Sequence, residues 1–317
     1  TRFRNVTGVQ TCALPICCQT KCTRNYYDES VHIRETKLVA AENGYDALMR
    51  SLKKPAPVTD GRKAAIIGGG PTGIAAAYFL GRAGIPVTVF EKSSRLGGVP
   101  MQVIPGFRIS EAAIEKDIAL MQFYGAEIRL NTPAPSVAEL NVAGYTHIFF
   151  AVGAGKAGRL NIPGNVVPVI QWLRDLKAGK KVSLGHVAVI GGGNTAMDAA
   201  RAAIRSGAAS ATLVYRRTKR YMPADAEELE LAMADGVRFL ELAAPVAQEN
   251  GRLKCERMTL GAPDEKGRRS PLPTGELMEF DCDTVIAAVG EQVEGELFTA
   301  NGIAVNAKDI PGFCTNL

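Results

Sequence analysis

The 317-residue sequence lacks long apolar runs, has only three histidines and, apart from the basic cluster at Arg216–Arg220, shows no concentration of charge of one sign. A membrane-spanning helix needs about 20 predominantly apolar residues, so we expect no membrane span. The histidines and the scattered acidic residues form no pattern typical of a metal-dependent hydrolase or a catalytic triad. The formal net charge of +5 is mild and gives no reason to expect a nucleic-acid partner.

Cysteine is sparse after the first 22 residues. Cys255, Cys282 and Cys314 lie far apart in the sequence, so they form neither a disulfide framework nor a C-x-x-C dithiol. This favours a reducing compartment, and we expect a cytoplasmic protein. The remaining four cysteines are close together, a density typical of metal or iron–sulfur sites: Cys12, Cys17, Cys18 and Cys22.

Part of this cysteine cluster is expected to be foreign to the protein. Val6–Ile16 (VTGVQTCALPI) reads, codon by codon, as the translation of a common sequencing-library adapter. The alternative is a natural loop or a cleaved signal, since CALPICC is mildly apolar. We therefore interpret residues 1–17 as an adapter-derived scar that takes no ordered part in the fold. Cys18 and Cys22 remain as native thiols.

Helical and strand-like segments alternate along the rest of the chain. Val31–Leu52 carries apolar residues at helical spacing, and the Pro-rich Lys53–Gly61 ends this helix. Short buried strands are predicted at Ala64–Ile67, Val87–Phe90, Val187–Ile190 and Thr212–Tyr215. The alternation predicts an α/β fold with parallel sheets. It includes two strand–glycine turn–helix motifs.

The first motif is a G-x-G-x-x-G formed by Gly68, Gly70 and Gly73. In dinucleotide-binding folds the first glycine allows the tight turn, the second lets a pyrophosphate approach, and the third lets helix and strand pack closely. Glu91 ends the next predicted strand, where a carboxylate can accept both ribose hydroxyls. Such glycines also occur in simple turns, but strand, helix and terminal acid together favour a nucleotide site.

The second motif is a G-x-G-x-x-A formed by Gly191, Gly193 and Ala196. Its second strand ends in Arg216 and Arg217 instead of an acid. A ribose 2′-phosphate repels a carboxylate, whereas a guanidinium can bind it with two hydrogen bonds. The alternative is a solvated basic surface. The position of the arginines favours NADPH over NADH.

Two such motifs in one chain, one followed by an acid and one by arginines, are typical of flavoproteins that bind a flavin and a nicotinamide nucleotide. Further segments resemble the glutamate synthase small-subunit family, which includes the N-terminal half of dihydropyrimidine dehydrogenase and a selenate reductase flavin subunit. These segments are VIPGFR (Val103–Arg108), FFAVGAGKAGRLNIPG (Phe149–Gly164), VYRRTKRYMPADAEELELA (Val214–Ala232) and DTVIAAVGE (Asp283–Glu291). The segment CTRNYYDESVHIRE resembles the end of the family's N-terminal helical iron–sulfur domain.

The resemblance implies two sets of cofactor-binding residues. FAD would be held by Gly68, Gly70, Pro71, Thr72, Gly73, Ile74, Glu91, Lys92, Arg95, Gly97, Gly98, Val99, Arg108 and Gly153. NADPH would be held by Gly191, Gly193, Asn194, Thr195, Ala196, Arg216 and Arg217, with Ala288, Val289 and Gly290 on the nicotinamide side. Hydride would pass directly from nicotinamide to flavin, so no catalytic acid or base is expected.

The family also implies that electrons leave the flavin through [4Fe–4S] clusters toward an electron-accepting subunit or domain. Cys18 and Cys22 would supply two thiolates of such a cluster, which takes four ligands. The alternative is that both are isolated thiols.

The expected domains are the scar (1–17), a remnant of a helical iron–sulfur domain (18–54), the first part of an FAD domain (62–155), an inserted NADPH domain (156–283) and a truncated second part of the FAD domain (284–317). All nucleotide-binding parts are expected to be Rossmann-like and three-layered. Two alternatives remain open. One is a thioredoxin-reductase-like flavoprotein, which requires a C-x-x-C dithiol, and the other is an inactive fragment that only binds nucleotide.

Overall fold

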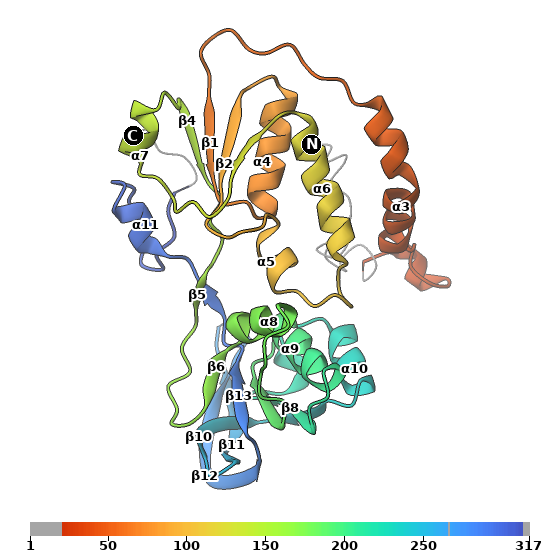
Figure 1. The fold of residues 1–317 in the computed structure, drawn as a ribbon. Helices are drawn as coiled ribbons and strands as arrows, with labels where there is room; N and C mark the ends of the chain where they lie inside the picture. The colour runs from red at the N-terminus through yellow and green to blue at the C-terminus, as the bar shows by residue number, and fades with distance from the viewer. Residues whose placement is uncertain (1–20, 266, 313–317) are drawn as a thin grey trace. The chain divides into compact units, whose positions relative to one another are not determined.

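The computed structural model describes residues 21–265 and 267–312, which form two compact units (Figure 1). The chain passes from the first unit to the second after Gly153 and returns after Gly295. Residues 305–310 again belong to the second unit. The expected scar (1–17) and Cys18 lie outside the described residues.

The first unit contains a four-stranded parallel sheet of the order β3-β2-β1-β4. Its strands are β1 (Ala64–Ile67), β2 (Val87–Phe90), β3 (Glu127–Arg129) and β4 (His147–Phe150). The predicted bounds of β1 and β2 are confirmed, and every residue of these two strands is buried. Helix α4 (Pro71–Arg82) connects β1 to β2, and α6 (Glu111–Phe123) precedes β3.

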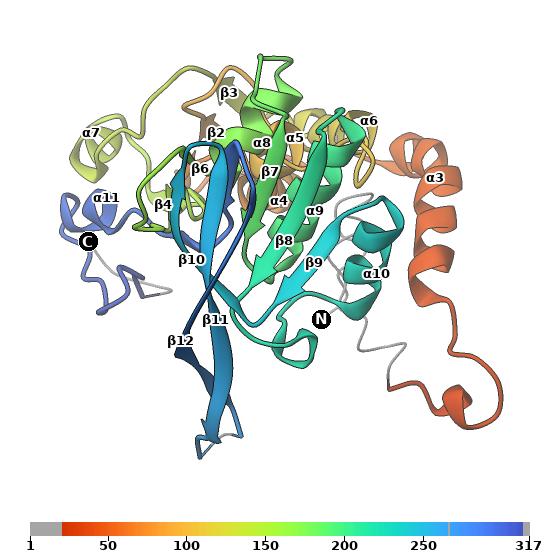
Figure 2. The ribbon, with the colours of Figure 1, turned by 90° about the horizontal axis from the view of Figure 1, so that it is seen from below.

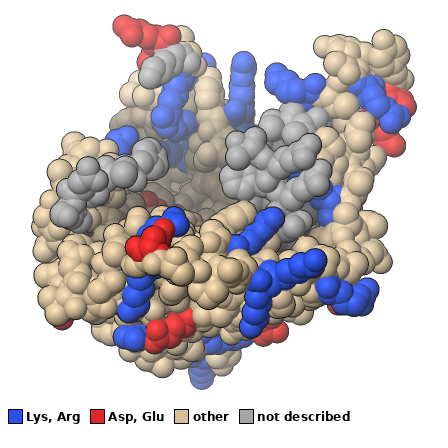
Figure 3. Space-filling view, turned by 90° about the horizontal axis from the view of Figure 1, so that it is seen from above, with Lys and Arg blue, Asp and Glu red and all other residues tan. Residues whose placement is uncertain are grey.

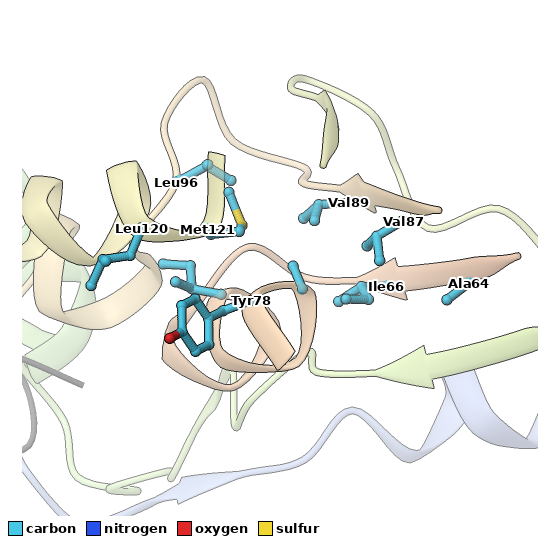
Figure 4. Close-up of a cluster of buried hydrophobic side chains, with 10 residues drawn as sticks. Ala64, Ile66, Tyr78, Val87, Val89, Leu96, Leu120 and Met121 are labelled. Carbon is cyan, nitrogen blue, oxygen red and sulfur yellow. The ribbon is translucent and has the colours of Figure 1, made fainter. Parts of the chain in front are cut away.

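The core of this unit lies between its strands and the helices α4 and α6 (Figure 4). Ile66 and Val89 project from neighbouring strands and are fully buried. Tyr78 of α4 and Met121 of α6 pack against them. Burying one large aliphatic side chain contributes about 1.5–3 kcal/mol, so this cluster holds the strand ends that carry the glycine turn in a fixed position.

Helix α3 (Ile33–Ser51) confirms the predicted N-terminal helix, with ends that differ by one or two residues. None of its residues is fully buried. Its C-terminal half nevertheless packs on the first unit, where Tyr45 and Leu48 contact the core. The Tyr45 hydroxyl also donates a hydrogen bond to the Lys116 carbonyl at 3.3 Å. The short helix η1 (Thr23–Tyr26) precedes α3.

The second unit contains a five-stranded parallel sheet of the order β6-β13-β7-β8-β9. Its strands are β6 (Val166–Pro168), β7 (His186–Ile190), β8 (Ser210–Tyr215), β9 (Arg238–Glu241) and β13 (Thr284–Ala287). Its helices are α8 (Val169–Lys177), α9 (Asn194–Arg205) and α10 (Ala226–Ala234). The predicted strands Val187–Ile190 and Thr212–Tyr215 lie inside β7 and β8.

The position of β13 corrects the expected domain boundary at residues 283 and 284. This strand pairs with β6 on one side and with β7 on the other, so it is a central strand of the second unit. All four of its residues are buried. The return to the first unit comes only at α11 (Gly295–Thr299), where the ring of Phe298 lies 5.3 Å from that of Phe150.

Two smaller sheets complete the second unit. Strands β10 (Ala243–Glu249), β11 (Arg252–Pro263) and β12 (Arg269–Asp281) form an antiparallel sheet in which β11 and β12 make a long hairpin (Figure 2). Strand β5 (Lys156–Ala157) pairs with β14 (Glu291–Gln292) where the chain enters and leaves the unit. In the part of the chain that the structure describes, no helix is long and apolar enough to cross a bilayer.

Candidate nucleotide-binding sites

The first glycine turn, between β1 and α4, is fixed by close packing at two of its glycines. Gly68 has a φ of +110°, and a Cβ there would overlap the carbonyl oxygen of Ala151. A Cβ on Gly73 would overlap the carbonyl oxygen of Gly68. Both positions therefore require glycine, because any side chain would displace the main chain.

Gly70 is different, since a Cβ there would fit without overlap. The nearest atom to a Cβ at this position would be the Cα of Gly98, at 3.8 Å. A second turn, which contains Gly97 and Gly98, packs against the first. Gly97 has a φ of +101° and donates its N–H to the Gly69 carbonyl at 2.8 Å. Helix α5 (Gly98–Gln102) starts there. The two glycine-bearing turns thus present main chain without side chains, which lets a pyrophosphate approach.

Glu91, directly after β2, is buried at 7% exposure and is held by two main-chain donors. One carboxylate oxygen accepts the N–H of Gly69 at 2.7 Å, and the other accepts that of Ser93 at 2.8 Å. Each carboxylate oxygen can accept more than one hydrogen bond. The carboxylate can therefore brace the glycine turn and still accept ribose hydroxyls.

The other expected flavin-binding residues surround this turn. Pro71 opens helix α4, where its missing N–H costs no hydrogen bond. Arg95 is exposed and paired with Glu111 at 2.8 Å, and the half-buried Arg108 donates its backbone N–H to Pro105. The remaining members lie in α4, in the loop after β2, in α5 and after β4: Thr72, Ile74, Lys92, Val99 and Gly153.

The second glycine turn, between β7 and α9, repeats this arrangement. A Cβ on Gly191 would overlap the carbonyl oxygen of Ala288, and the φ of Gly191 is +156°. Around Gly193 a Cβ would meet no described atom within 4 Å. At the second glycine of both motifs a Cβ would therefore overlap no described atom, and the main chain of both turns fits a dinucleotide pyrophosphate.

The start of α9 lies directly behind this open glycine. Ala196 is fully buried, as the close helix–sheet packing of the motif requires. Asn194 is exposed, and its side-chain oxygen accepts the N–H of Asp225 at 3.2 Å. With Thr195 these residues form the first turn of a helix whose N–H groups lack intrahelical partners, and such a turn favours an anion.

Arg216 and Arg217 follow β8 at the same edge of the sheet, but the structure separates their roles. Arg216 is exposed, whereas Arg217 is 9% exposed and its Nε donates to the carbonyl oxygen of Arg269 at 3.2 Å. The sequence pattern gives no reason to distinguish Arg216 from Arg217. It also does not indicate that Arg217 contacts Arg269, which lies in a hairpin far along the chain. Elsewhere, basic and acidic side chains are interspersed over the face drawn in Figure 3.

The segment Ala288–Gly290 follows β13 and lies beside the second glycine turn. Ala288 donates its N–H to Ile190 at 2.9 Å and lies against Gly191. Val289 is exposed, and the Gly290 carbonyl accepts the N–H of Gly158 at 2.8 Å. The structure thus brings this segment to the second site within one unit.

Cys22 is the one expected cluster ligand within the described residues, and Cys18 is not described. The backbone N–H groups of Val31 and Arg24 hold the pKa of the Cys22 thiol below its usual value, which favours the thiolate that a metal needs. No group of three or more potential ligands that could hold a metal occurs in residues 21–265 and 267–312.

Cys255 and Cys282, far apart in the sequence, belong to one buried cluster in the structure. Burial raises the pKa of Cys255 to about 12 and that of Cys282 to about 11. Both are free thiols. Because the thiolate is the nucleophile in disulfide exchange, these residues lack the reactivity of a redox dithiol. This disfavours the thioredoxin-reductase-like alternative.

Comparison with known proteins agrees with this geometry. A family model described as pyridine nucleotide-disulphide oxidoreductase matches residues 62–311. The chain belongs to this family. Among its curated relatives, YgfK of Escherichia coli (strain K12), named as an oxidoreductase, is 41% identical over 301 residues, which cover 93% of this chain and 29% of YgfK. The NADPH glutamate synthase small chain of Azospirillum brasilense is 32% identical over 265 residues, covering 74% of this chain and 54% of the relative.

These relatives confirm the resemblance to the glutamate synthase small-subunit family, and the chain spans only part of their length. Among solved structures, FprA, an oxidoreductase of Mycobacterium tuberculosis, is similar with a TM-score of 0.61 and 19% sequence identity. The match covers 73% of this chain and 71% of FprA. The fold of the two-dinucleotide-binding flavoproteins is thereby confirmed for this chain.

Proposed function

We propose that the first unit binds FAD, that the second binds NADPH, and that the protein is an NADPH-dependent flavin oxidoreductase. The observation that carries this proposal is the repeated turn, in which a Cβ would overlap main-chain atoms at Gly68 and Gly191 but none at Gly70 and Gly193. In the first motif the buried carboxylate of Glu91 follows strand β2. In the second motif the buried guanidinium of Arg217 follows strand β8. FAD accepts hydride from NADPH and can release electrons singly, and that is the chemistry the two cofactors supply.

The chain's own residues have binding and orienting roles in this proposal. Glu91 would accept the adenosine ribose hydroxyls, and the main chain at Gly70 and Gly98 would approach the FAD pyrophosphate. Gly193 and the first turn of α9 would do the same for NADPH, and the segment Ala288–Gly290 would lie on the nicotinamide side. No side chain needs to act as an acid or a base.

For the whole protein we propose onward electron transfer through [4Fe–4S] clusters to an accepting subunit or domain. The name of the Azospirillum relative, a small chain, supports a partner of this kind. Cys22 and Cys18 would contribute to such a cluster, whose other ligands would lie outside this chain, because a cluster takes four. The buried free thiols support a cytoplasmic location.

The proposal is tested by adding FAD and titrating the purified chain with NADPH and NADH. We expect visible flavin absorption that stays with the protein after gel filtration, and tighter binding of NADPH than of NADH. Hydrogen bonds to charged groups contribute about 1.5–3 kcal/mol each, so the double variant Arg216→Ala with Arg217→Ala should bind NADPH on the order of a hundredfold more weakly. NADH binding should be unchanged.

High salt should reduce the preference, since it is electrostatic. Equal affinity for both nucleotides would contradict the assignment of the second unit. Nucleotide binding without any retained flavin would identify the chain as the inactive fragment that only binds nucleotide.

A further inference from the structure

Arg217 is a nearly buried cation that has no acidic partner among the described residues. It is 9% exposed, and the one hydrogen bond of its guanidinium to a described residue goes to a main-chain carbonyl. No carboxylate of the described residues lies within ion-pair distance of its guanidinium. Buried charges in proteins are normally paired. An unpaired one at the end of β8 is therefore suited to an anionic ligand.

The main chain and the side chain of Arg217 are both fixed by distant segments. Its carbonyl accepts the N–H of Leu242, beyond β9, at 3.2 Å. Its Nε donates to the Arg269 carbonyl, also at 3.2 Å. A guanidinium has five N–H donors, so this arrangement uses one donor to orient the group and leaves four for a ligand.

The position of the Arg269 carbonyl is itself fixed by the side chain of the same residue. The Arg269 guanidinium donates from Nε to the Gly261 carbonyl at 2.6 Å and from Nη2 to the Leu260 carbonyl at 2.8 Å. These bonds cross from β12 to β11 where the register of the hairpin shifts, between Leu260 and Pro263. They hold together a part of the hairpin where the regular ladder is interrupted.

We propose that the β11–β12 hairpin is part of the device that selects NADPH, with Arg269 as a positioning residue for Arg217. This rests on the proposed function and deepens it. Arg217 provides the main contact to the 2′-phosphate. Its side chain is already oriented before the ligand binds, and a pre-oriented group loses little entropy on binding. Arg216, which is exposed, contributes mainly through its charge.

The test compares NADP⁺ and NAD⁺ binding by calorimetry in the whole chain, in four single variants and in one double variant. Arg269→Ala should weaken NADP⁺ binding about tenfold, the size expected for loss of one oriented charge-assisted contact, and leave NAD⁺ binding unchanged. Arg269→Lys keeps the charge but cannot reproduce the planar fork of a guanidinium. A severalfold loss of NADP⁺ affinity in that variant would therefore show that the hydrogen-bond geometry of Arg269 matters, and not only its charge. Circular dichroism and melting curves accompany each variant.

Arg252→Ala is the matched control. Arg252 is on the same hairpin, but it is exposed, and its ion pairs with described residues are to Glu279 at 3.4 Å and Asp281 at 3.6 Å. It should change the affinity for neither nucleotide. If Arg269→Ala fails to fold, Arg269→Lys still decides, because unchanged NADP⁺ affinity in that variant would overturn the proposal.

A double variant measures the energetic coupling between Arg217 and Arg269 in NADP⁺ binding. If Arg269 acts through Arg217, then Arg217→Ala with Arg269→Ala should bind NADP⁺ as weakly as Arg217→Ala alone. Additive losses, or equal losses for NADP⁺ and NAD⁺, would overturn the positioning role. Preference for NADP⁺ that disappears in Arg217→Ala but survives in Arg269→Ala would overturn this inference alone. A wild-type chain without preference would overturn the proposed function with it.

Discussion

Glu91 and Arg217 both follow the second strand of a glycine-turn motif, Glu91 directly and Arg217 after Arg216, and each is nearly buried. The sequence predicts their identity and their opposite charge. It does not predict which groups orient the two side chains, because the carbonyl that the Arg217 guanidinium binds belongs to Arg269, in a hairpin with no recognisable motif. The carboxylate of Glu91 is held from Gly69 and Ser93, and the guanidinium of Arg217 from Arg269.

Glu91→Ala should remove both the brace of the first glycine turn and the proposed ribose acceptor. Each lost charge-assisted hydrogen bond costs about 1.5–3 kcal/mol, so flavin retention should fall by tenfold or more and the melting temperature should also fall. The measurement is the flavin-to-protein absorbance ratio after gel filtration, with a thermal melt of each sample.

Glu127→Ala serves as the control for this substitution. Glu127 begins the neighbouring strand β3, but it is exposed and pairs with Arg129 at 2.8 Å. Its loss should leave the flavin content unchanged. Full flavin content in Glu91→Ala would rule out a ribose-binding role for that carboxylate.

Asp235, at the end of α10, should make the stability of the second unit dependent on pH. Hydrogen bonds from Arg205 and then Arg201 lower its pKa from 3.8 to about 2. A carboxyl group with a lowered folded-state pKa stabilises the fold above its unfolded pKa, and this stabilisation is lost as the pH falls through the folded value. The shift corresponds to about 2 kcal/mol.

Urea unfolding of wild type and Asp235→Asn checks this expectation. The difference in the free energy of unfolding should be constant near neutral pH and should shrink as the pH falls from about 4 toward about 2. A difference that does not change with pH in this range would mean that the charge of Asp235 contributes nothing.

At the scale of elements, the buried parallel strands were predictable and the exposed antiparallel ones were not. Strands β1 and β2 are short apolar runs bounded by glycine and by polar residues, so their bounds follow from the pattern. Strand β12 is exposed at most of its positions and shows no apolar alternation that would reveal it. The segment that contains β13 shows a resemblance to the family, but the position of the strand in the sheet depends on pairing with residues about a hundred positions away.

Two substitutions in the second glycine turn should affect different properties, one nucleotide binding and the other stability. Gly193→Ala should leave stability nearly unchanged, because its φ of −98° suits alanine and the space around it is open. It should nevertheless weaken NADPH binding tenfold or more, since the methyl group would stand where the pyrophosphate approaches.

Gly191→Ala should destabilise the protein by about 1–3 kcal/mol, the usual cost of a strained backbone conformation, because its Cβ overlaps Ala288. Thermal melts and nucleotide titrations of both variants check the pair. Equal nucleotide affinity in wild type and Gly193→Ala would show that this glycine does not face the ligand.

At the scale of the whole molecule, the second unit is a nearly continuous insertion whose ends meet at the β5–β14 pair. Segments with their own core and adjacent ends can fold alone. A fragment comprising residues 154–295 should therefore be folded and bind NADPH without flavin. A fragment comprising residues 154–283 should be unfolded, because it lacks β13.

Circular dichroism, proteolysis and NADPH titration distinguish the two fragments. A folded, NADPH-binding 154–283 fragment would restore the boundary expected from the sequence. The comparison thus tests where one nucleotide-binding unit ends and the other resumes.

Strand β13 lies between β6 and β7 but is synthesised long after both. A ribosome adds about 5–20 residues per second, so translation from the end of β7 at Ile190 to the start of β13 at Thr284 takes roughly 5–20 s. During that interval β6 and the inner edge of β7 have no partner on the nascent chain, and unpaired strand edges invite pairing with other chains. The growing polypeptide is therefore most vulnerable to aggregation just before its 287th residue emerges, and chaperone demand should peak at that stage of synthesis.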